Sequence, residues 1–595
     1  MREYSTPLTI ALPTSGNLTD DVVRNAAEAP DAVQFSRAGA DGGWTDVTCA
    51  EFLAEVSAVA KGLVAAGIEP GDRVALVSRT RYEWTLLDYA IWFAGAATVP
   101  IYESSSEEQI QWILSDSGAR AVVVEDAGHL ARVEPSHAGL PDLAHVWSLE
   151  DDAVGVLTAL GAEVSDDDLE KRRTTAGPGD LATLIYTSGT TGRPKGCMLT
   201  HGNFQAELGV AVSELERLFE TDGASTLLFL PLAHVFARII QVGCVKARTR
   251  LGHSADIKNL LPQLTTFQPT FILAVPRVFE KVFNTASQRA TADGKGRIFD
   301  RAAEAAIAYS RALDGGRVPV RVRAQHALFS RLVHGRLRTA LGGRCEFAVS
   351  GGAPLGDRLG HFYRGIGVTV LEGYGLTETT AALTVNLPEA QKVGTVGRPL
   401  QGTAVRIADD GELLFRGGQV FAGYWRNPDA TAEALQDGWF HTGDVGEVDD
   451  EGFVRITGRK KEILVTAGGK NVAPAVLEDR VRAAALVSQC LVVGDGQPFI
   501  AALVTIDEEA FPAWAEQHGK TGRIADLVDD EDLRAEIQAA VDEANKAVSK
   551  AESIRKFTIL PHDWTEEAGQ VTPSLKLKRN VVLREYREEI AELYE

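Results

Sequence analysis

The sequence contains few cysteines and no long apolar run. Its five cysteines are scattered without a C-x-x-C pair, which argues against a zinc cluster and indicates buried thiols in a reducing compartment. The longest apolar stretch, residues 90–102, is shorter than the roughly 20 residues that a membrane-spanning helix needs. The first residues lack a basic segment leading into an apolar core, so we expect no signal peptide. The sequence therefore predicts a cytoplasmic protein, which could still contact a membrane surface.

Positive charge is also scarce. The chain has 60 Lys and Arg residues against 82 Asp and Glu residues, a net charge of −22. A protein that binds duplex nucleic acid needs a basic face, so this composition argues against nucleic acid as a partner. An anionic substrate would need a local positive site instead. The 595 residues exceed the roughly 250–300 that a single core holds, which predicts more than one domain. No pattern in the sequence sets an oligomeric state.

Strand-like and helix-like segments alternate through the first three quarters of the chain, for example "DRVALVS" followed by "YEWTLLDYAIWFAGAA". This alternation predicts an α/β fold with largely parallel sheets. Between Lys281 and Arg344, an Ala- and Arg-rich stretch predicts two helices joined by "DGGRVPV". From about Gly394 the pattern changes to short strands, with hairpins expected in "AVRIADDGELLFRG" and "GEVDDEGFVRITGR". We predict a large N-terminal domain of residues 1–459, β-rich at about 394–459, and a small C-terminal α+β domain of residues 460–595.

A short loop, "YTSGTTGRPKG" at residues 186–196, combines three glycines, four serine or threonine hydroxyls and one lysine. Glycines let the backbone approach a phosphate, hydroxyls donate to its oxygens, and Lys195 supplies a positive charge. The preceding "DLATLIYT" predicts a buried strand and the following segment a helix, so the helix dipole would assist anion binding. The common phosphate loop needs Ser or Thr directly after the lysine, and here Gly196 follows it. Composition alone also fits a mobile surface turn.

Three more segments carry groups suited to a nucleotide. "VSGGAPL" predicts a strand ending in a glycine pair, where a flat ring could lie against the backbone. In "LEGYGLTETT", Tyr374 between two glycines could stack on a base, and Glu378 could hold Mg²⁺. In "GWFHTGDVGEV", Asp444 is expected at the mouth of a strand, where a carboxylate can accept both ribose hydroxyls. Each segment taken alone also fits an ordinary turn.

Together and in this order, "YTSGTTGRPKG", "GYGLTETT", "TGD" and "GRKKEILVTAGGKNVAP" resemble the adenylate-forming superfamily of acyl-CoA synthetases, luciferases and peptide-synthetase adenylation domains. The resemblance covers nearly the whole chain. It implies a large N-terminal domain and a small mobile C-terminal domain, with ATP, Mg²⁺ and CoA as cofactors or substrates. It also implies two half-reactions. A carboxylate displaces pyrophosphate from ATP to give an acyl-adenylate, and a thiol then displaces AMP.

The resemblance assigns roles to residues at the matching positions. The implied ATP site comprises Thr187, Ser188, Gly189, Thr190, Thr191, Gly192, Lys195, Gly351, Gly352, Ala353, Glu372, Gly373, Tyr374, Gly375, Thr377, Asp444, Arg459 and Lys576. Thr187 and Glu378 would hold Mg²⁺, and Gly468 and Gly469 would let the pantetheine arm of CoA pass. Lys461 would lie at the hinge between the domains.

The catalytic lysine of the family lies near the C-terminus, usually after a glycine. In this chain the matching stretch is "TPSLKLKRN", with Leu575 in place of the glycine. We align Lys576 with the catalytic lysine, and Lys578 is the alternative. Its implied role is to neutralise charge on the carboxylate and the α-phosphate during adenylation.

The segment "LPLAHVFAR" bears on the acid that is activated. Members that activate amino acids usually place an aspartate soon after this region to pair the substrate ammonium, whereas this chain has His234, Val235 and Phe236. An unpaired buried ammonium would be costly, which disfavours an amino acid and suits an apolar acyl chain. With "VPRVFEKVF" and the helical insertion, this segment is most similar to bacterial long-chain fatty acyl-CoA synthetases. Phe236 would line or gate the acyl pocket, or pack in the core. His234 would contact the carboxylate, or be an ordinary hydrogen-bonded histidine.

Three hypotheses follow. The first is a long-chain fatty acid–CoA ligase. The second is a fatty acyl-AMP ligase that loads an acyl carrier protein. The third is a protein that binds nucleotide without turnover, which the presence of Lys195, Glu378, Asp444 and Lys576 disfavours.

Overall fold

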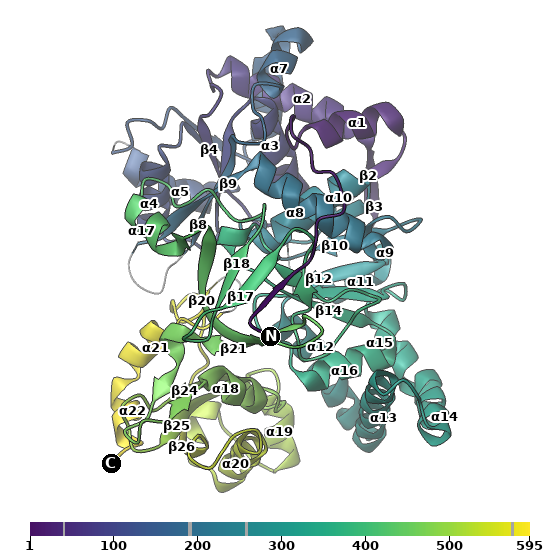
Figure 1. The fold of residues 1–595 in the computed structure, drawn as a ribbon, viewed down its shortest axis with the longest axis vertical. Coiled ribbons are helices and arrows are strands. Elements are labelled where there is room, and N and C mark those ends of the chain that lie inside the picture. The colour runs from purple at the N-terminus through teal and green to yellow at the C-terminus, as the bar shows by residue number, and fades with distance from the viewer. Residues whose placement is uncertain (40–41, 138, 188–192, 256–259, 573–575) are drawn as a thin grey trace.

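The computed structural model describes residues 1–39, 42–137, 139–187, 193–255, 260–572 and 576–595. A large N-terminal part is joined to a smaller C-terminal part at the lower left of Figure 1. Their apolar cores are separate, because the clusters of the first part extend to Ile456 and those of the second begin at Leu464. The predicted α/β fold with a second, small domain is confirmed. The predicted boundary after residue 459 lies in the interval between the cores, and its exact position stays a prediction.

The first sheet of the N-terminal part has six strands in the order β7-β6-β4-β5-β8-β9. Its strands are β4 (Arg73–Val77), β5 (Ala97–Ile101), β6 (Ala121–Val124), β7 (His145–Ser148), β8 (Leu181–Thr187) and β9 (Lys195–Thr200). The first five are parallel, whereas β9 runs antiparallel to β8. The central strands are buried on both faces, as is usual for a parallel sheet covered by helices.

The second sheet has nine strands in the order β16-β15-β14-β13-β12-β10-β11-β2-β3. Its strands are β2 (Val33–Ala38), β3 (Trp44–Thr48), β10 (Ser225–Leu228), β11 (Arg250–His253), β12 (Phe271–Ala274), β13 (Phe347–Ser350), β14 (Thr369–Tyr374), β15 (Thr384–Val385) and β16 (Arg398–Pro399). The six central strands are parallel. The carboxyl ends of β12, β13 and β14 therefore meet at one edge, where α/β sheets usually bind ligands.

Buried helices join the two sheets into one core. They are α3 (Tyr82–Phe93), α8 (His201–Glu214) and α10 (Val235–Ala247). Arg238 of α10 and Asp88 of α3 form an ion pair in which both side chains are 0% exposed. Arg238 also donates to the Thr183 hydroxyl of β8 at 2.5 Å, and Asp88 accepts from Thr98 of β5 at 2.7 Å. This network fixes α10 against the first sheet, because an unpaired charge at such depth would be strongly destabilising.

A third, antiparallel sheet is built from strands at both ends of the N-terminal part. Its order is β1-β17-β18-β20-β19, with β21 paired to β20. The strands are β1 (Glu3–Ser5), β17 (Ala404–Ile407), β18 (Glu412–Arg416), β19 (Leu435–Gln436), β20 (Trp439–Val448) and β21 (Val454–Arg459). Both predicted hairpins are confirmed, since β17 pairs with β18 and β20 with β21.

The predicted helical insertion forms a projection at the lower right of Figure 1. It follows α12 (Pro276–Ala292) and contains α13 (Gly296–Asp314), α14 (Val320–Phe329), a π-helical turn (Ser330–His334) and α15 (Gly335–Ala340). The predicted pair of helices joined by "DGGRVPV" is confirmed. Within the residues that the structure describes, no helix combines the length and apolar character needed to cross a bilayer.

The C-terminal part contains a three-stranded sheet, β24 (Val487–Val493), β25 (Ile500–Ile506) and β26 (Ile554–Ile559). Its helices include α18 (Pro474–Arg482) and α20 (Glu531–Asn545). It contacts α12 of the N-terminal part through Arg277, which lies 3.2 Å from both Asp507 and the Ser488 hydroxyl. Lys281 pairs with Glu509 at 2.8 Å. These contacts hold the C-terminal part next to the edge where β12, β13 and β14 end.

Candidate active site

The carboxyl ends of β13 and β14 form a glycine-lined floor. A Cβ built on Gly351 would lie 3.2 Å from Cζ of Phe236 and 3.5 Å from the Gly373 carbonyl oxygen. At Gly352 the backbone φ is +83°, a left-handed conformation that glycine adopts without strain. Because neither glycine carries a side chain, other groups can lie close to the backbone at these two positions. The structure therefore brings together the predicted residues Gly351, Gly352, Gly373 and Phe236.

Lys576 of the C-terminal part lies over this floor. A Cβ on Gly352 would lie 3.6 Å from Cε and 3.9 Å from Nζ of Lys576. The residue as a whole is solvent-exposed, while the protein around it partly desolvates the ammonium. This desolvation, followed by the charge of Arg459, lowers the pKa of Lys576, while Asp444 and Glu378 act in the opposite direction. Lys578 instead lies at the start of α21 (Arg579–Glu585), where its backbone N–H donates to the Gln570 carbonyl. Of the two lysines, Lys576 is the one that faces the predicted site.

Asp444 lies within β20 and not at the mouth of a strand, which corrects the prediction. The strand bends locally, because Gly443 has a φ of +70° and the pairing shifts nearby. The bend directs Asp444 toward Tyr374, whose hydroxyl donates to it at 2.5 Å, and toward Arg459, whose Nε lies 3.1 Å away. Burial raises the pKa of Asp444, and the charges of Arg459 and Lys576 oppose that shift. Two predicted nucleotide residues therefore anchor the carboxylate.

A second cluster surrounds Glu378, which follows β14. Its carboxylate accepts a 2.8 Å hydrogen bond from the Tyr424 hydroxyl, and the Lys195 ammonium lies 5.2 Å from the centre of the Tyr424 ring. The Cys197 thiol lies 4.0 Å from the Thr187 hydroxyl. Burial, and then the charge of Glu378, raises the pKa of Cys197. Thr187, Lys195 and Glu378, which the sequence predicts to act together, are therefore brought to one place.

The glycine-rich loop connects two strands, which corrects the predicted strand–loop–helix arrangement. Thr187 of β8 pairs directly with Lys195 of β9, so the loop closes a β-hairpin. The following helix, α8, begins only at His201, where Thr200 and Asn203 form a reciprocal cap. The helix therefore does not follow the loop directly, since β9 lies between them in the chain. Ser188, Gly189, Thr190, Thr191 and Gly192 lie outside the described residues.

His234 and Phe236 lie at the start of α10. His234 caps the helix, and its Nδ1 accepts a 3.1 Å hydrogen bond from the Phe236 N–H. Burial, and secondarily the charge of Lys576, lowers the pKa of His234 to about 3. The ring is therefore neutral at physiological pH, and its proton is on Nε2 because Nδ1 accepts. His234 thus offers one neutral N–H donor in the vicinity of Lys576.

Glu372 makes a contact that its motif does not indicate, and its implied place in the nucleotide pocket stays a prediction. Its side chain accepts a 3.0 Å hydrogen bond from the Leu355 N–H, behind the turn that contains Gly351 and Gly352. Burial raises the pKa of Glu372 to about 7. The side chain therefore braces this turn from the core side, while its neighbour Tyr374 reaches Asp444.

The remaining predicted residues are a partly buried glycine, two exposed glycines of the C-terminal part, and three residues next to elements already described. Gly375 lies where a Cβ would be 1.4 Å from the Ala381 carbonyl oxygen, so its identity is set by backbone packing. Gly468 and Gly469 lie at the exposed tip of the hairpin between β22 (Leu464–Val465) and β23 (Asn471–Val472), with open space around Gly469. Ala353 follows the glycine pair, Thr377 begins the short helix with Glu378, and Lys461 follows β21 on the surface.

Three contributing residues escaped the sequence analysis. Tyr424 and Cys197 complete the Glu378 cluster, and Trp112 donates to the Pro194 carbonyl at 3.0 Å while its ring lies 4.6 Å from the Arg193 guanidinium. Tyr424 is 46 residues from Glu378, and no local pattern marks such a contact. Cys197 directly follows the quoted loop, and this closeness in sequence to Lys195 was the available signal.

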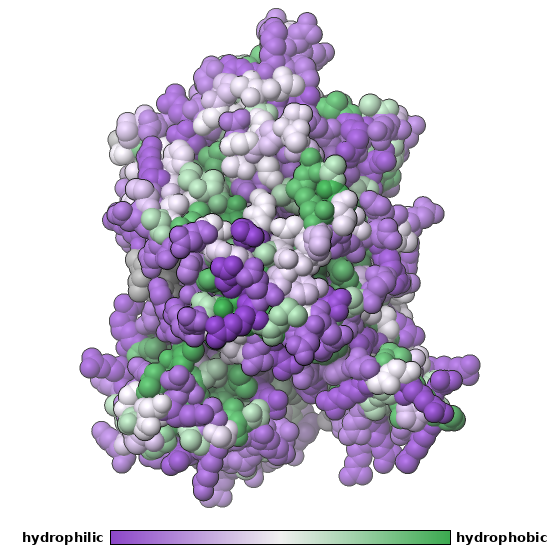
Figure 2. Space-filling view, in the orientation of Figure 1, coloured by the Kyte–Doolittle hydropathy of each residue, from purple (hydrophilic) through white to green (hydrophobic). Residues whose placement is uncertain are grey.

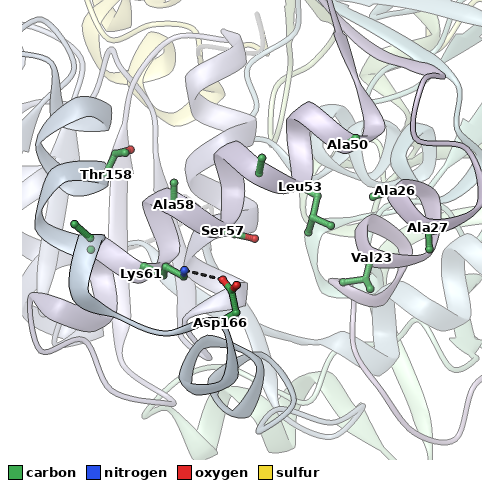
Figure 3. Close-up of a pocket in the computed structure, with 13 residues that line it drawn as sticks. Val23, Ala26, Ala27, Ala50, Leu53, Ser57, Ala58, Lys61, Thr158 and Asp166 are labelled. Carbon is green, nitrogen blue, oxygen red and sulfur yellow. Dashed lines mark ion pairs between the residues drawn. The ribbon is translucent and has the colours of Figure 1, made fainter.

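A cavity of about 670 Å³ lies elsewhere in the N-terminal part, between α1 (Asp20–Glu28), α2 (Cys49–Ala65) and α6 (Ala153–Leu160) (Figure 3). Its lining is mainly alanine, with the ion pair of Lys61 and Asp166 at 2.7 Å on one side. None of the predicted site residues lines it. Because the convergent polar groups lie around Lys576, we place the active site there.

A lysine of the small part over a glycine turn of the large part, beside a buried aspartate, defines a two-domain enzyme with one shared site. Residues 22–425 match the AMP-binding enzyme family, and residues 461–595 match the AMP-binding enzyme C-terminal domain. The chain belongs to the AMP-binding enzyme family.

Relatives and solved structures agree with this assignment. The chain is 52% identical over 599 residues to long-chain-fatty-acid–CoA ligase FadD15 of Mycobacterium bovis, covering 100% of both chains. It is 30% identical to long-chain-fatty-acid–CoA ligase ACSBG2 of Gallus gallus, covering 93% of this chain and 78% of that one. The crystal structure of the anthranilate CoA ligase AuaEII with anthranoyl-AMP has a TM-score of 0.72 at 20% identity, covering 98% and 99% of the chains. At that identity the last similarity concerns the fold alone.

Proposed function

We propose that this protein is a long-chain fatty acid–CoA ligase that forms an acyl-adenylate from ATP and transfers the acyl group to CoA. One observation carries the proposal. Lys576 lies over the Gly351–Gly352 floor, where the charges of Asp444, Arg459 and Glu378 influence its pKa. The full-length similarity to a curated long-chain-fatty-acid–CoA ligase supports the same reading.

The nucleotide would lie between the glycine floor and the Asp444 cluster. The adenine would lie against Gly351, Gly352 and Ala353, with Tyr374 beside it. Asp444 would accept the ribose hydroxyls, because Arg459 and Tyr374 already hold its carboxylate in place. Lys195 and the loop that it closes would bind the phosphates.

The residues around Glu378 fit a magnesium ion. Glu378 and Thr187, which are both close to Cys197, would provide oxygen ligands, and Mg²⁺ is usually held by one or two carboxylates together with substrate phosphates. When bound, the ion would offset the negative charge of the phosphates. Tyr424, which donates to Glu378 at 2.8 Å, would fix the carboxylate orientation.

In the first half-reaction a carboxylate oxygen attacks the α-phosphorus, and the bond from phosphorus to the bridging oxygen of pyrophosphate breaks. Lys576 would neutralise the charge that accumulates on the carboxylate and the α-phosphate, an electrostatic role that needs no protein nucleophile. His234 would donate its Nε2–H to an oxygen of the acid, since its low pKa keeps the ring neutral.

In the second half-reaction the CoA thiol attacks the acyl carbon, and the bond to the AMP oxygen breaks. Lys576 fills the space above Gly352, whereas Gly468 and Gly469 lie at an exposed hairpin tip. A rotation of the C-terminal part near Lys461 would exchange the two. The contacts of Arg277 with Asp507 and Ser488 would be those that break.

The acid would enter beside Phe236. The segment around it is apolar and buried, with Leu232, Ala233 and Val235 each no more than 2% exposed. No carboxylate among the described residues of this segment could pair a substrate ammonium. A fatty acid fits such surroundings, because only its carboxylate needs polar partners.

Release of AMP from ATP tests the function directly. The enzyme would be supplied with fatty acids of increasing chain length, with and without CoA, and with Lys576→Ala as a control for contaminating activity. We expect CoA-dependent turnover that rises with chain length. Adenylate formation without CoA-dependent release would favour a ligase that loads an acyl carrier protein. No adenylation of any fatty acid would overturn the proposal.

A further inference from the structure

The helical projection carries a charge opposite to that of the protein. Residues 296–338 contain nine arginines, no lysine and three acidic residues, a net charge of +6 in a chain of net charge −22. The projection lies at the lower right of Figure 1, with α14 at its outer side. The rest of the molecule is therefore strongly acidic, and the basic charge is concentrated on one protruding element.

Eight of the nine arginines of this projection form no ion pair within the described residues, whereas Arg338 donates to the Ile366 carbonyl oxygen at 2.7 Å. Those without an ion pair to any described residue are Arg297, Arg301, Arg311, Arg317, Arg321, Arg323, Arg331 and Arg336. Asp314, one of the three acidic residues, is taken by Arg364 of α16 (Asp357–Ile366) at 2.6 Å. All eight are exposed. Eight exposed and unneutralised guanidinium groups on one element favour an anionic partner.

The same element exposes an apolar stripe. Val320 is 82% exposed, Leu328 56% and Leu332 53%. Val320, Ala324 and Leu328 recur every four residues on α14, so they share one helical face, with Arg321 and Arg323 to either side of it. Apolar residues are visible in green among hydrophilic ones at the lower right of Figure 2.

The opposite face of α14 is fixed to the protein. The His326 ring stacks on Tyr309 of α13 with 3.9 Å between ring centres, and its Nε2 lies 2.6 Å from the Gly365 carbonyl oxygen. Phe329 is buried in a cluster with Ala302 and Ala305 of α13. The exposed face is therefore held outward by a rigid scaffold. The exposure of these apolar residues is therefore not a result of poor packing of α14.

We propose that the projection of residues 296–338 docks this protein on an anionic phospholipid surface. Val320, Leu328 and Leu332 would enter the apolar layer, while the arginines extend to the lipid phosphates, as long basic side chains do beside a buried apolar stripe. Nucleic acid would match the arginines but not the exposed apolar residues. The inference rests on the proposed function only in its purpose, since long-chain fatty acids reside in bilayers.

Sedimentation with vesicles tests the proposal on the full-length protein. The probes are phosphatidylcholine vesicles with and without about a third of phosphatidylglycerol. We expect binding only to the anionic vesicles and release at high salt. Arg321→Glu/Arg323→Glu/Arg331→Glu should weaken partitioning by about 100-fold or more, since each basic residue near an anionic leaflet contributes roughly a factor of five. Val320→Ser/Leu328→Ser should also weaken it, and the binding that remains should depend on salt at least as strongly as that of the parent, because the arginines then carry it.

Control substitutions lie on elements outside the projection. Arg523→Glu/Arg555→Glu reverses two exposed charges of the C-terminal part, and Val156→Ser/Leu160→Ser replaces two apolar residues that are 49% and 48% exposed. Both controls should bind vesicles as the parent does. Ligase activity on a short, water-soluble fatty acid without lipid should be unchanged in every variant, which separates this proposal from the proposed function.

Several outcomes would overturn the proposal. Equal binding to both kinds of vesicle, or undiminished binding of the arginine variant, would remove the surface from consideration. A change of oligomeric state in the variants with no vesicle binding by the parent would identify an interface between copies of this acidic chain. Salt-sensitive binding of duplex DNA by the parent, with no binding to anionic vesicles, would identify a nucleic-acid surface.

Discussion

The side chain of Lys576 lies against Gly352, a residue 224 positions earlier in the chain, and a Cβ on that glycine would stand 3.6 Å from the lysine Cε. The contact joins the two parts of the protein at the point where the carboxyl ends of β12, β13 and β14 meet. In the proposed reaction this contact would bring the lysine charge to the place where the acid and the α-phosphate react.

Replacement of this lysine should separate the two half-reactions. We expect Lys576→Ala to lower the rate of adenylate formation by about 100-fold or more, while the attack of CoA on a supplied acyl-adenylate stays within a few-fold of the parent. Pyrophosphate release and thioester formation measure the two steps separately. Lys578→Ala is the matched control and should leave both rates nearly unchanged. If the loss followed Lys578 instead, the assignment would be wrong.

The rate of adenylation should also fall at alkaline pH. The pKa of Lys576 is lowered by desolvation and by Arg459, so the ammonium loses its proton below the pH at which an ordinary lysine does. We therefore expect kcat/KM for adenylation to fall as pH rises, with a midpoint below about 10.4. The Lys576→Arg variant should show no such fall up to that pH, whatever its absolute rate. A profile shared by parent and variant would assign the titration to another group.

A smaller side chain at position 236 should compensate for a larger one at position 351. A Cβ on Gly351 would lie 3.2 Å from the Phe236 ring, so Gly351→Ala should displace the ring into the acyl entrance and lower kcat/KM for long fatty acids. Phe236→Leu should restore part of the loss, because the smaller side chain gives the methyl group room. Activities of the two single variants and the double variant, measured across chain lengths, check this. Strictly additive losses would show that the contact is unrelated to the acyl entrance.

The ion pair between Arg277 and Asp507 should favour the adenylation conformation. Its two side chains are each 24% exposed, so its contribution is modest, about 1 kcal/mol. We expect Arg277→Glu to slow adenylation by roughly five-fold relative to thioester formation. Exchange of the charges in Arg277→Glu/Asp507→Arg should restore the ratio. An unchanged ratio in the single variant would exclude this contact from the control of the conformational change.

Glu372 should make the protein less stable at high pH. Its folded pKa of about 7 lies above that of an unfolded chain, so the folded state holds a proton that the unfolded state has released in this window. Stability therefore falls as pH rises from about 4.5 to about 7. Glu372→Gln removes this dependence and should stabilise the protein at pH 8 by about 2–3 kcal/mol relative to its effect at pH 4.5. Thermal unfolding at both pH values measures the difference, and an equal effect at both would place the carboxyl in a more polar setting than the fold shows.

Local patterns were sufficient to predict most of the elements. Runs such as "DLATLIYT" and the two Asp-Asp-Gly or Asp-Glu-Gly hairpins are set by neighbours in sequence, and all of them form as expected. The prediction of a helix directly after the glycine-rich loop was wrong, because Lys195–Thr200 pairs with β8 and forms a strand. Only at Thr200 does the cap with Asn203 start the helix.

The candidate site divides in a similar way. Residues in short motifs, such as Lys195, Glu378 and Asp444, could be named from the sequence. Their partners could not, because Tyr424 reaches Glu378 from 46 residues away and the position of Lys576 depends on how the two parts meet. Glu372 shows the converse limit. Its implied place in the nucleotide pocket stays a prediction, but no local pattern indicates that its carboxylate accepts a hydrogen bond from the Leu355 N–H, 17 residues earlier in the chain.

The pairing of β1 with β17 constrains the order of assembly during synthesis. Glu3 pairs with Arg406, and a ribosome that adds about 5–20 residues per second needs tens of seconds to cover that separation. The first strand must therefore wait, unpaired, until the third sheet emerges. We infer that this sheet closes late, and that the nascent chain carries an open strand edge through most of its translation.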